Sequence, residues 1–146
     1  MKIYVTQIYI ETGMSYRFSH NFQNWLSEQL TSRVQPSPAF VQTYGKDFNL
    51  VFNMSAKSKI ADVEIKGPTV FERTKDVEFS IFLPHAGCQP RSPDGYRQPL
   101  NLLLQGITDV LERFGMDTSE VVNAAPTLIE HIIWTPEMFK PRTTMV

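Results

Sequence analysis

Apolar and polar side chains alternate between Gly67 and Pro84, and this pattern predicts two β-strands joined by a charged turn. In the second strand one row of apolar side chains, Val77, Phe79, Ile81 and Leu83, alternates with Glu78, Ser80 and Phe82. A period of two places successive side chains on opposite faces of a sheet, so the first row faces a core. The polar run 72–76 suits the turn, and Pro84 ends the second strand because it has no backbone N–H to donate.

Other strands are expected at four segments. Residues 3–11 are rich in β-branched and aromatic side chains on both faces, which is typical of a central strand. Strands are also predicted at 40–44, 48–55 and 61–66, separated by turn residues. The connections between these strands are short, and short connections favour antiparallel pairing.

Two longer segments carry apolar residues at spacings of three and four, which predicts amphipathic helices. The first begins near Ser19, whose hydroxyl can cap a free backbone amide, and its apolar stripe is Phe22, Trp25, Leu26, Leu30 and Val34. The second ends at Gly115, and its stripe is Leu100, Leu103, Leu104, Ile107, Val110, Leu111 and Phe114. A short helix over 119–123, capped by Asp117 or Thr118, and a further helical turn from Pro126 follow.

These elements predict an α+β fold in the order β-α-β-β-β-β-β-α-α. We expect a single antiparallel sheet of about five or six strands, with the two main amphipathic helices packed on one face. A chain of 146 residues is long enough to bury its own core. We therefore expect one domain at 1–146, with a proline-rich loop at 84–99 and a loosely held tail at 135–146.

The charge balance and the cysteine content narrow the classes of partner and compartment. The formal net charge is -1, which disfavours nucleic acid and anionic membranes as partners. The single cysteine, Cys88, cannot form an intramolecular disulfide. Residues 1–13 alternate in polarity unlike a secretory signal, and no apolar run approaches the roughly 20 residues that span a bilayer. These features favour a soluble protein of the cytoplasm.

Residues that suit catalysis or metal binding are few and isolated. His85 and Cys88 have the spacing of half a zinc site, but a zinc site needs three or four protein ligands. His20 and His131 have no second ligand near them in the sequence, and Cys88 lies in no recognisable nucleophile setting.

Two acids on the predicted strand 61–66, Asp62 and Glu64, suit acid and base roles, although alternating charges on a strand are more often a solvated face. The glycine motifs that bind nucleotide phosphates are missing from the sequence. We predict no catalytic residue, no metal and no cofactor, and hence a protein that is not an enzyme.

The proline-rich segment 84–99 is the first candidate for a partner-binding surface, because long loops are usually functional or disordered. Arg91, Tyr96 and Arg97 combine positive charge with an aromatic ring, a mixture that suits stacking on bases. Asp94 and the near-neutral net charge weaken that interpretation, and a protein partner that takes Tyr and Arg as anchors is at least as well supported. The charged turn adds further candidates, for which plain solubility is the simpler role: Glu72, Arg73, Lys75 and Asp76.

The segment VEIKGPTVFERTKDVEFSIFLP, followed by a loop and by LLLQGITDVLERFGMDTSEVV, resembles the small immunity proteins encoded beside bacterial polymorphic toxins, in particular the immunity protein 39 group. The resemblance covers 61–122, and its motifs are structural: a Gly-Pro turn, a strand that ends in FLP, and a Leu-rich helix that contains Gly106. It implies a cytoplasmic, single-domain α+β protein that binds and neutralises a cognate toxin domain. The N-terminal third of the chain falls outside the resemblance.

An alternative is a non-catalytic module that binds a small molecule or has a structural role. In that hypothesis Phe40, Phe48, Phe52 and Trp25 enclose an aromatic pocket between the sheet and the helices. Such a pocket needs convergent polar groups, which the sequence does not indicate, so the inhibitor ranks first. An enzyme that uses His85, Cys88 or the strand acids ranks last.

Overall fold

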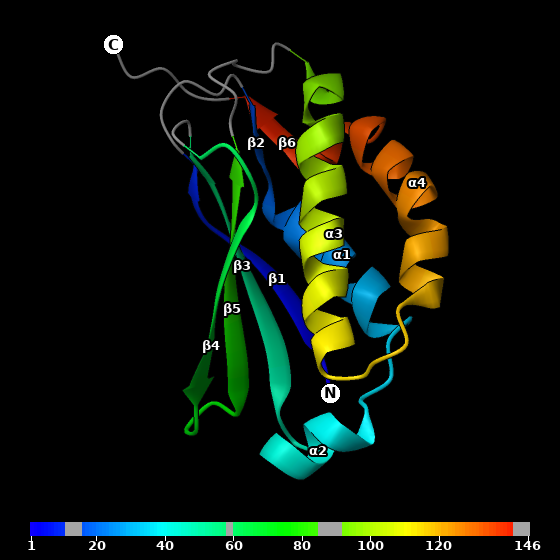
Figure 1. Cartoon of the computed structure of the whole chain (residues 1–146). Coiled ribbons are helices and arrows are strands. Elements are labelled where there is room, and N and C mark those ends of the chain that lie inside the picture. The colour runs from blue at the N-terminus through cyan, green and yellow to red at the C-terminus, as the bar shows by residue number, and fades with distance from the viewer. Residues whose placement is uncertain (11–15, 58–59, 85–91, 142–146) are drawn as a thin grey trace.

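The computed structural model describes residues 1–10, 16–57, 60–84 and 92–141 (Figure 1). Its elements in chain order are β1 (Ile3–Ile10), β2 (Tyr16–Phe18), α1 (His20–Thr31), α2 (Pro38–Tyr44), β3 (Asn49–Lys57), β4 (Glu64–Phe71), β5 (Asp76–Pro84), the 3-10 turn η1 (Pro93–Tyr96), α3 (Arg97–Arg113), α4 (Ser119–Ile133), the 3-10 turn η2 (Pro136–Met138) and β6 (Phe139–Pro141). The predicted α+β class is confirmed, and several of its details are wrong.

The main sheet is mixed, not antiparallel as predicted. Its strand order is β1-β3-β5-β4; β1 pairs with β3 and β3 with β5 in parallel, and only β4 and β5 are antiparallel. Parallel neighbours need long crossovers, which α1 and α2 provide between β1 and β3. The short link from Lys57 to Glu64 joins strands that are not neighbours, because β5 lies between them. Connection length alone therefore misled the prediction.

Residues 38–44 form helix α2, although a strand is predicted at 40–44. The Ser37 hydroxyl accepts a hydrogen bond from the backbone nitrogen of Phe40 at 3.1 Å, and Pro38 occupies the first turn of the helix. A serine cap followed by proline is a helix start signal, and here it outweighs the β-branched and aromatic content of the segment.

Helix α4 is one continuous helix that contains Pro126, where two shorter helical pieces are predicted. Its N-cap residue is Thr118, whose side chain makes no capping hydrogen bond, and the preceding Asp117 carboxylate accepts a hydrogen bond from the backbone nitrogen of Ser119 at 2.9 Å. This backbone bond, together with one from the Ser119 hydroxyl, holds the pKa of Asp117 below its ordinary value.

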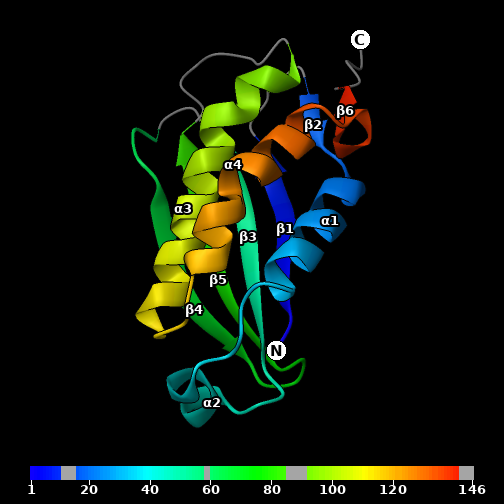
Figure 2. The same cartoon turned by 90° about the vertical axis from the view of Figure 1, so that its right-hand side faces the viewer.

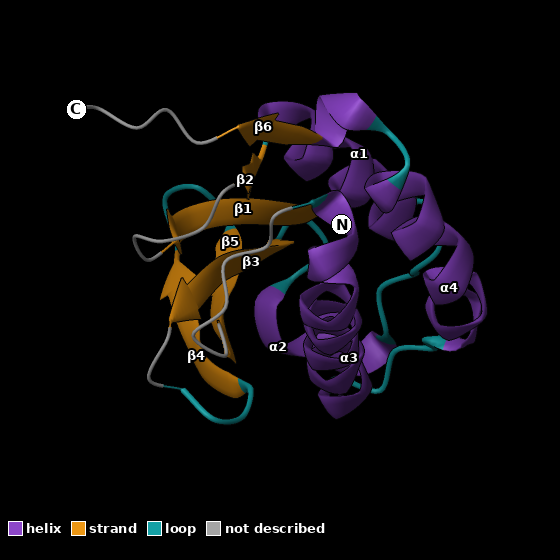
Figure 3. Cartoon of the chain, turned by 90° about the horizontal axis from the view of Figure 1, so that it is seen from above, coloured by secondary structure: helices purple, strands orange, loops and turns teal. Residues whose placement is uncertain are grey.

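The helices cover one face of the main sheet, and the core lies between the two layers (Figure 3). The predicted row on β5 is buried there, as are Leu50, Phe52 and Met54 of β3. Helix α1 packs on β1, and α3 packs on β5 and against α4 (Figure 2). The opposite face of the sheet carries no helix (Figure 3). Among the described residues, no helix has both the length and the apolar character that crossing a bilayer requires.

The C-terminal segment is packed as far as Pro141, contrary to the predicted loosely held tail at 135–146. Strand β6 pairs antiparallel with β2, and Met138 and Phe139 are buried. The Phe139 ring centroid lies 5.3 Å from that of Phe18, so this two-stranded sheet, formed by segments from the two ends of the chain, packs on the core. Residues 142–146 lie outside the described residues.

The predicted loop at 84–99 is shorter than expected, because η1 begins at Pro93 and α3 begins at Arg97. Residues 85–91 lie outside the described residues.

Candidate protein-interaction surfaces

The predicted partner-binding residues fall into two groups at opposite ends of the molecule. The β4–β5 turn lies at one end of the sheet, whereas Asp94 and Arg97 lie at the start of α3, at the other end (Figure 1). The structure therefore does not bring the two groups into one surface. Arg91 lies outside the described residues.

The β4–β5 turn exposes Glu72, Arg73 and Lys75, whereas Asp76 is half-buried at the start of β5. The backbone of Lys75 has a φ of 59°, its carbonyl oxygen accepts a hydrogen bond from Asn49, and its ammonium lies 5.3 Å from the Phe48 ring centroid. This lysine therefore helps to hold the turn against the start of β3. Its interactions give it a structural role in the turn.

Tyr96 is fully buried, so the prediction that its side chain forms part of an accessible binding surface is wrong. Its ring centroid lies 4.8 Å from that of Phe18 and 5.3 Å from that of Phe139. Burial raises the pKa of the Tyr96 phenol well above its ordinary value, because removal from water disfavours the charged phenolate. The 3-10 turn η1 turns this side chain inward, which the sequence pattern does not indicate.

Asp94 and Arg97 belong to a hydrogen-bonded cluster that joins the start of α3 to the end of α4. Arg97 Nη2 lies 2.8 Å from Asp94 Oδ1, and Nη1 of the same guanidinium forms an ion pair with Glu130. The other oxygen of Glu130 accepts a hydrogen bond from the indole N–H of Trp134 at 2.9 Å. We call Asp94, Arg97, Glu130 and Trp134 the Trp134 platform. Because its two halves are 33 residues apart in the chain, sequence reasoning missed Glu130 and Trp134.

Trp134 is 74% exposed, the largest exposed fraction among the exposed large hydrophobic side chains of the described residues. A second aromatic contact lies on the same part of α4. The half-buried ring of Trp25 stacks on the exposed His131 ring at a centroid distance of 4.5 Å. This stack connects α1 to α4 and places Trp25 in a contact between helices.

The sheet face that carries no helix holds a row of polar side chains across three strands. The Thr6 hydroxyl donates to the Asn53 side-chain oxygen, and the Asn53 amide donates to the Glu78 carboxylate. Asn53 is only 5% exposed, so these bonds satisfy a buried amide. The row therefore fixes polar side chains at the centre of this face.

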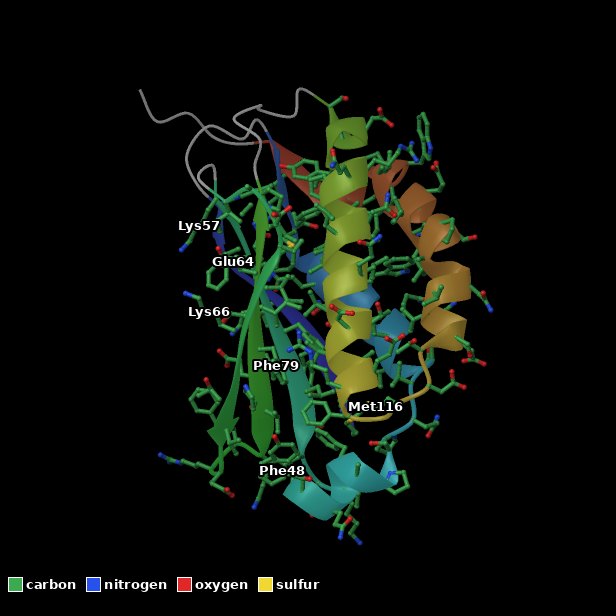
Figure 4. The ribbon with its side chains drawn as sticks, in the orientation of Figure 1. Phe48, Lys57, Glu64, Lys66, Phe79 and Met116 are labelled. Carbon is green, nitrogen blue, oxygen red and sulfur yellow. The ribbon has the colours of Figure 1, made fainter. Side chains whose placement is uncertain are left out.

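Two lysines on the same face lie over one aromatic ring. The Lys57 ammonium is 4.7 Å from the Phe82 ring centroid, and the Lys66 ammonium is 5.2 Å from it. Glu64 is the cross-strand neighbour of Phe82. Figure 4 shows Lys57, Glu64 and Lys66 pointing away from the helices, whereas Phe79 lies on the helix side. Within the described residues neither lysine has a carboxylate within ion-pair distance.

The aromatic pocket of the alternative hypothesis does not form. Phe40, Phe48 and Phe52 are buried core residues, and the ring of Phe52 lies against that of Phe79. Trp25 does not join them, because its ring stacks on His131 between α1 and α4. A separate open groove of about 480 Å³ runs between α3 and β4 and is lined by Val63, Ile65, Leu102, Gln105, Gly106, Thr108, Asp109 and Arg113.

The residues considered for catalysis or metal binding are not brought together in the described part of the chain. Glu64 begins β4, but Asp62 precedes the strand, so the two acids do not share a strand face as predicted. His20 begins α1, on a different element from His131. No group of three or more His, Cys, Asp or Glu residues suited to a metal ion occurs among the described residues, which do not include residues 85–91.

Comparisons of the chain with protein-family models, with curated proteins and with solved structures give no match.

Proposed function

We propose that this chain is an immunity protein that binds and neutralises a cognate toxin domain, and that the Trp134 platform is part of the binding surface. The observation that carries the proposal is a tryptophan that is 74% exposed and is held in place by a hydrogen bond to Glu130. The resemblance of 61–122 to the immunity protein 39 group supplies the class of partner.

The platform has the chemistry of a protein-binding anchor. Tryptophan and arginine are the residues most enriched among interface positions that dominate binding energy. The Glu130 carboxylate fixes the indole by its N–H and is itself held by Arg97. A side chain that is already ordered loses less conformational freedom on binding, so more of its contact energy contributes to affinity.

Neutralising a toxin domain requires a complementary surface and no reaction. A stable interface buries about 800 Å² on each partner, which is enough to cover an active-site entrance. The surface that we propose for this contact includes Trp134 and the stacked pair of Trp25 and His131, which come from α1 and α4.

The test is binding to the toxin domain encoded by the neighbouring gene. We expect the wild-type protein to rescue growth when it is co-expressed with that domain, and Trp134→Ala to weaken the measured affinity by about 30-fold or more, the effect of losing a dominant anchor. Val122→Ala is the matched control, because Val122 is also on α4 and is 53% exposed. Its affinity should stay within about three-fold of wild type.

Two results would contradict the proposal in different ways. If the wild-type protein neither binds the toxin domain nor protects the cell, the proposed immunity function is wrong. If wild type and Trp134→Ala bind with equal affinity and both protect, the immunity function is supported, but the Trp134 platform is not part of the interface.

A small-molecule-binding module is the second candidate, and the groove between α3 and β4 favours it. Apolar Val63, Ile65 and Leu102 and polar Asp109 and Arg113 converge there. Mass spectrometry of the protein purified under native conditions tests this candidate. A bound compound that is lost in Leu102→Glu would support it, and protein free of any compound would count against it.

A further inference from the structure

We propose that the helix-free face of the main sheet binds an extended acidic polypeptide segment through Lys57 and Lys66. This inference concerns a different face from the Trp134 platform and does not rest on the proposed immunity function. Its basis is the arrangement of two ammonium groups over one aromatic ring on the sheet face that carries no helix.

The first step is the state of the two lysines. Both ammonium groups contact the face of the Phe82 ring, whose negative charge density attracts cations. The distance between the two ammonium nitrogens cannot exceed the sum of their distances to the Phe82 ring centroid. Two like charges are therefore held close to each other. Neither is neutralised by a carboxylate within 4.0 Å in the described part of the chain. Among the described residues, the two ammonium groups are therefore not held in ion pairs and can bind the carboxylates of a partner.

The second step is the shape of the surface. Lys57 comes from β3, Phe82 from β5 and Lys66 from β4, so the site runs across the strands toward the β4 edge of the sheet. In an extended chain, side chains two residues apart lie on one face and are about 7 Å apart. This spacing lies within the upper limit that the two centroid distances set for the separation of the ammonium groups, so carboxylates at alternate positions can each approach one lysine.

The third step distinguishes an acidic peptide from a nucleic acid. Glu64 pairs directly with Phe82, and Glu78 lies further along the same face. These carboxylates repel a strand that carries a phosphate at every nucleotide. A peptide with acidic residues only at alternate positions can place a neutral residue beside Glu64, so the mixed charges favour a peptide.

The test uses a capped peptide of alternating threonine and glutamate, with alternating threonine and glutamine as its uncharged control, and follows amide shifts of the labelled protein by NMR. We expect shifts around Lys57, Lys66 and Phe82 with the acidic peptide and a loss of binding as salt is raised. Lys57→Gln and Lys66→Gln should each weaken binding by about two- to five-fold, the range for exposed charge pairs.

Glu64→Gln provides a control of opposite sign. Removing this carboxylate should strengthen binding of the acidic peptide by about two- to five-fold, which a general loss of structure cannot produce. Lys46→Gln is the matched lysine control, because Lys46 is an exposed lysine before β3 and outside the site. Its affinity should equal that of wild type.

Four results would overturn the proposal. These are no shifts at the site with the acidic peptide, equal affinity for the glutamine peptide, an equal loss in Lys46→Gln, or tighter binding of oligothymidylate than of the acidic peptide. The last result would assign the surface to nucleic acid.

Discussion

The backbone nitrogen of Val5 donates a hydrogen bond to the Ser27 hydroxyl at 2.8 Å, so a helix side chain takes the place of a neighbouring strand. β1 is an edge strand of the main sheet. One turn further along α1, the Thr31 hydroxyl accepts from the backbone nitrogen of Ile3 at 3.0 Å and donates to the carbonyl oxygen of the same residue at 3.1 Å. Helix α1 thereby satisfies backbone groups that would otherwise present an open edge.

Removing the Ser27 hydroxyl should lower stability. Ser27→Ala leaves the part-buried backbone nitrogen of Val5 without this acceptor, so we expect the free energy of unfolding to fall by about 1–2 kcal/mol in urea denaturation. The control is Ser32→Ala, which removes an exposed hydrogen bond from the Ser32 hydroxyl to the backbone oxygen of Gln29 and should change stability by no more than about 0.5 kcal/mol. Equal losses in the two variants would show that the edge contact contributes nothing specific.

Truncating Phe139 tests whether the C-terminal segment is part of the fold. Phe139 is 7% exposed and packs against Phe18 and Tyr96, so Phe139→Ala should cost about 3 kcal/mol by thermal or urea unfolding. Lys140→Ala, at the neighbouring exposed position, should change stability by less than about 0.5 kcal/mol. A loosely held tail predicts no difference between these variants, and that outcome would contradict the packing seen here.

Alanine at Gly67 should be poorly tolerated. Gly67 has a φ of 133°, and an added Cβ would lie 2.7 Å from the Glu78 carbonyl oxygen, in backbone that cannot move freely. We expect Gly67→Ala to cost about 3 kcal/mol. Gly115 also has a positive φ, 75°, but a Cβ there meets nothing within 4 Å, so Gly115→Ala should cost only about 1 kcal/mol. Denaturant titration of both variants checks the difference, and a reversed order would contradict the steric argument.

The buried phenol of Tyr96 should make stability depend on alkaline pH. Burial raises its pKa in the folded state, whereas the unfolded chain keeps a tyrosine pKa of about 10. Below pH 10 both states carry the proton and the shift has no effect. Above it the unfolded state loses the proton first, so folding stability falls by about 1.4 kcal/mol per pH unit.

The comparison that isolates this effect is wild type against Tyr96→Phe, unfolded in urea at pH 9 and pH 11. All other titratable groups are common to the two proteins, so only the difference in slope reports on Tyr96. The wild type should lose more stability over this interval than the variant. Parallel losses would mean that the Tyr96 phenol ionises as readily in the folded state as in the unfolded chain.

The periodicity of the sequence predicts the main elements and their buried faces. The alternating row from Val77 to Leu83 and the helical stripe from Leu100 to Leu111 are buried as predicted. The hydroxyl of Ser19 caps α1, and Gly115, with its positive φ, follows the end of α3. These features depend on residues close together in the chain, so a linear reading of the sequence captures them.

The candidate surfaces were predicted only in part. Asp94 and Arg97 do lie at an accessible cluster, but its exposed aromatic residue is Trp134, and Tyr96 between them points into the core. The signals for Glu130 and Trp134 were a spacing of four residues on one helix and a tryptophan at its end. Neither signal indicates that Arg97 lies beside Glu130 and Trp134 in the folded protein.

By itself the sequence determined where most of the longer strands and helices form and which face of each is apolar, but not the helix α2 or the short strands β2 and β6. Tertiary structure alone decided that β5 lies between β3 and β4, that the Val5 amide meets Ser27, and that Trp134 joins Arg97 through Glu130. The physical reason is that a period of two or of 3.6 is the same whichever strands or helices become neighbours. Neighbours are chosen by the packing of the whole chain, in contacts between residues far apart in the sequence.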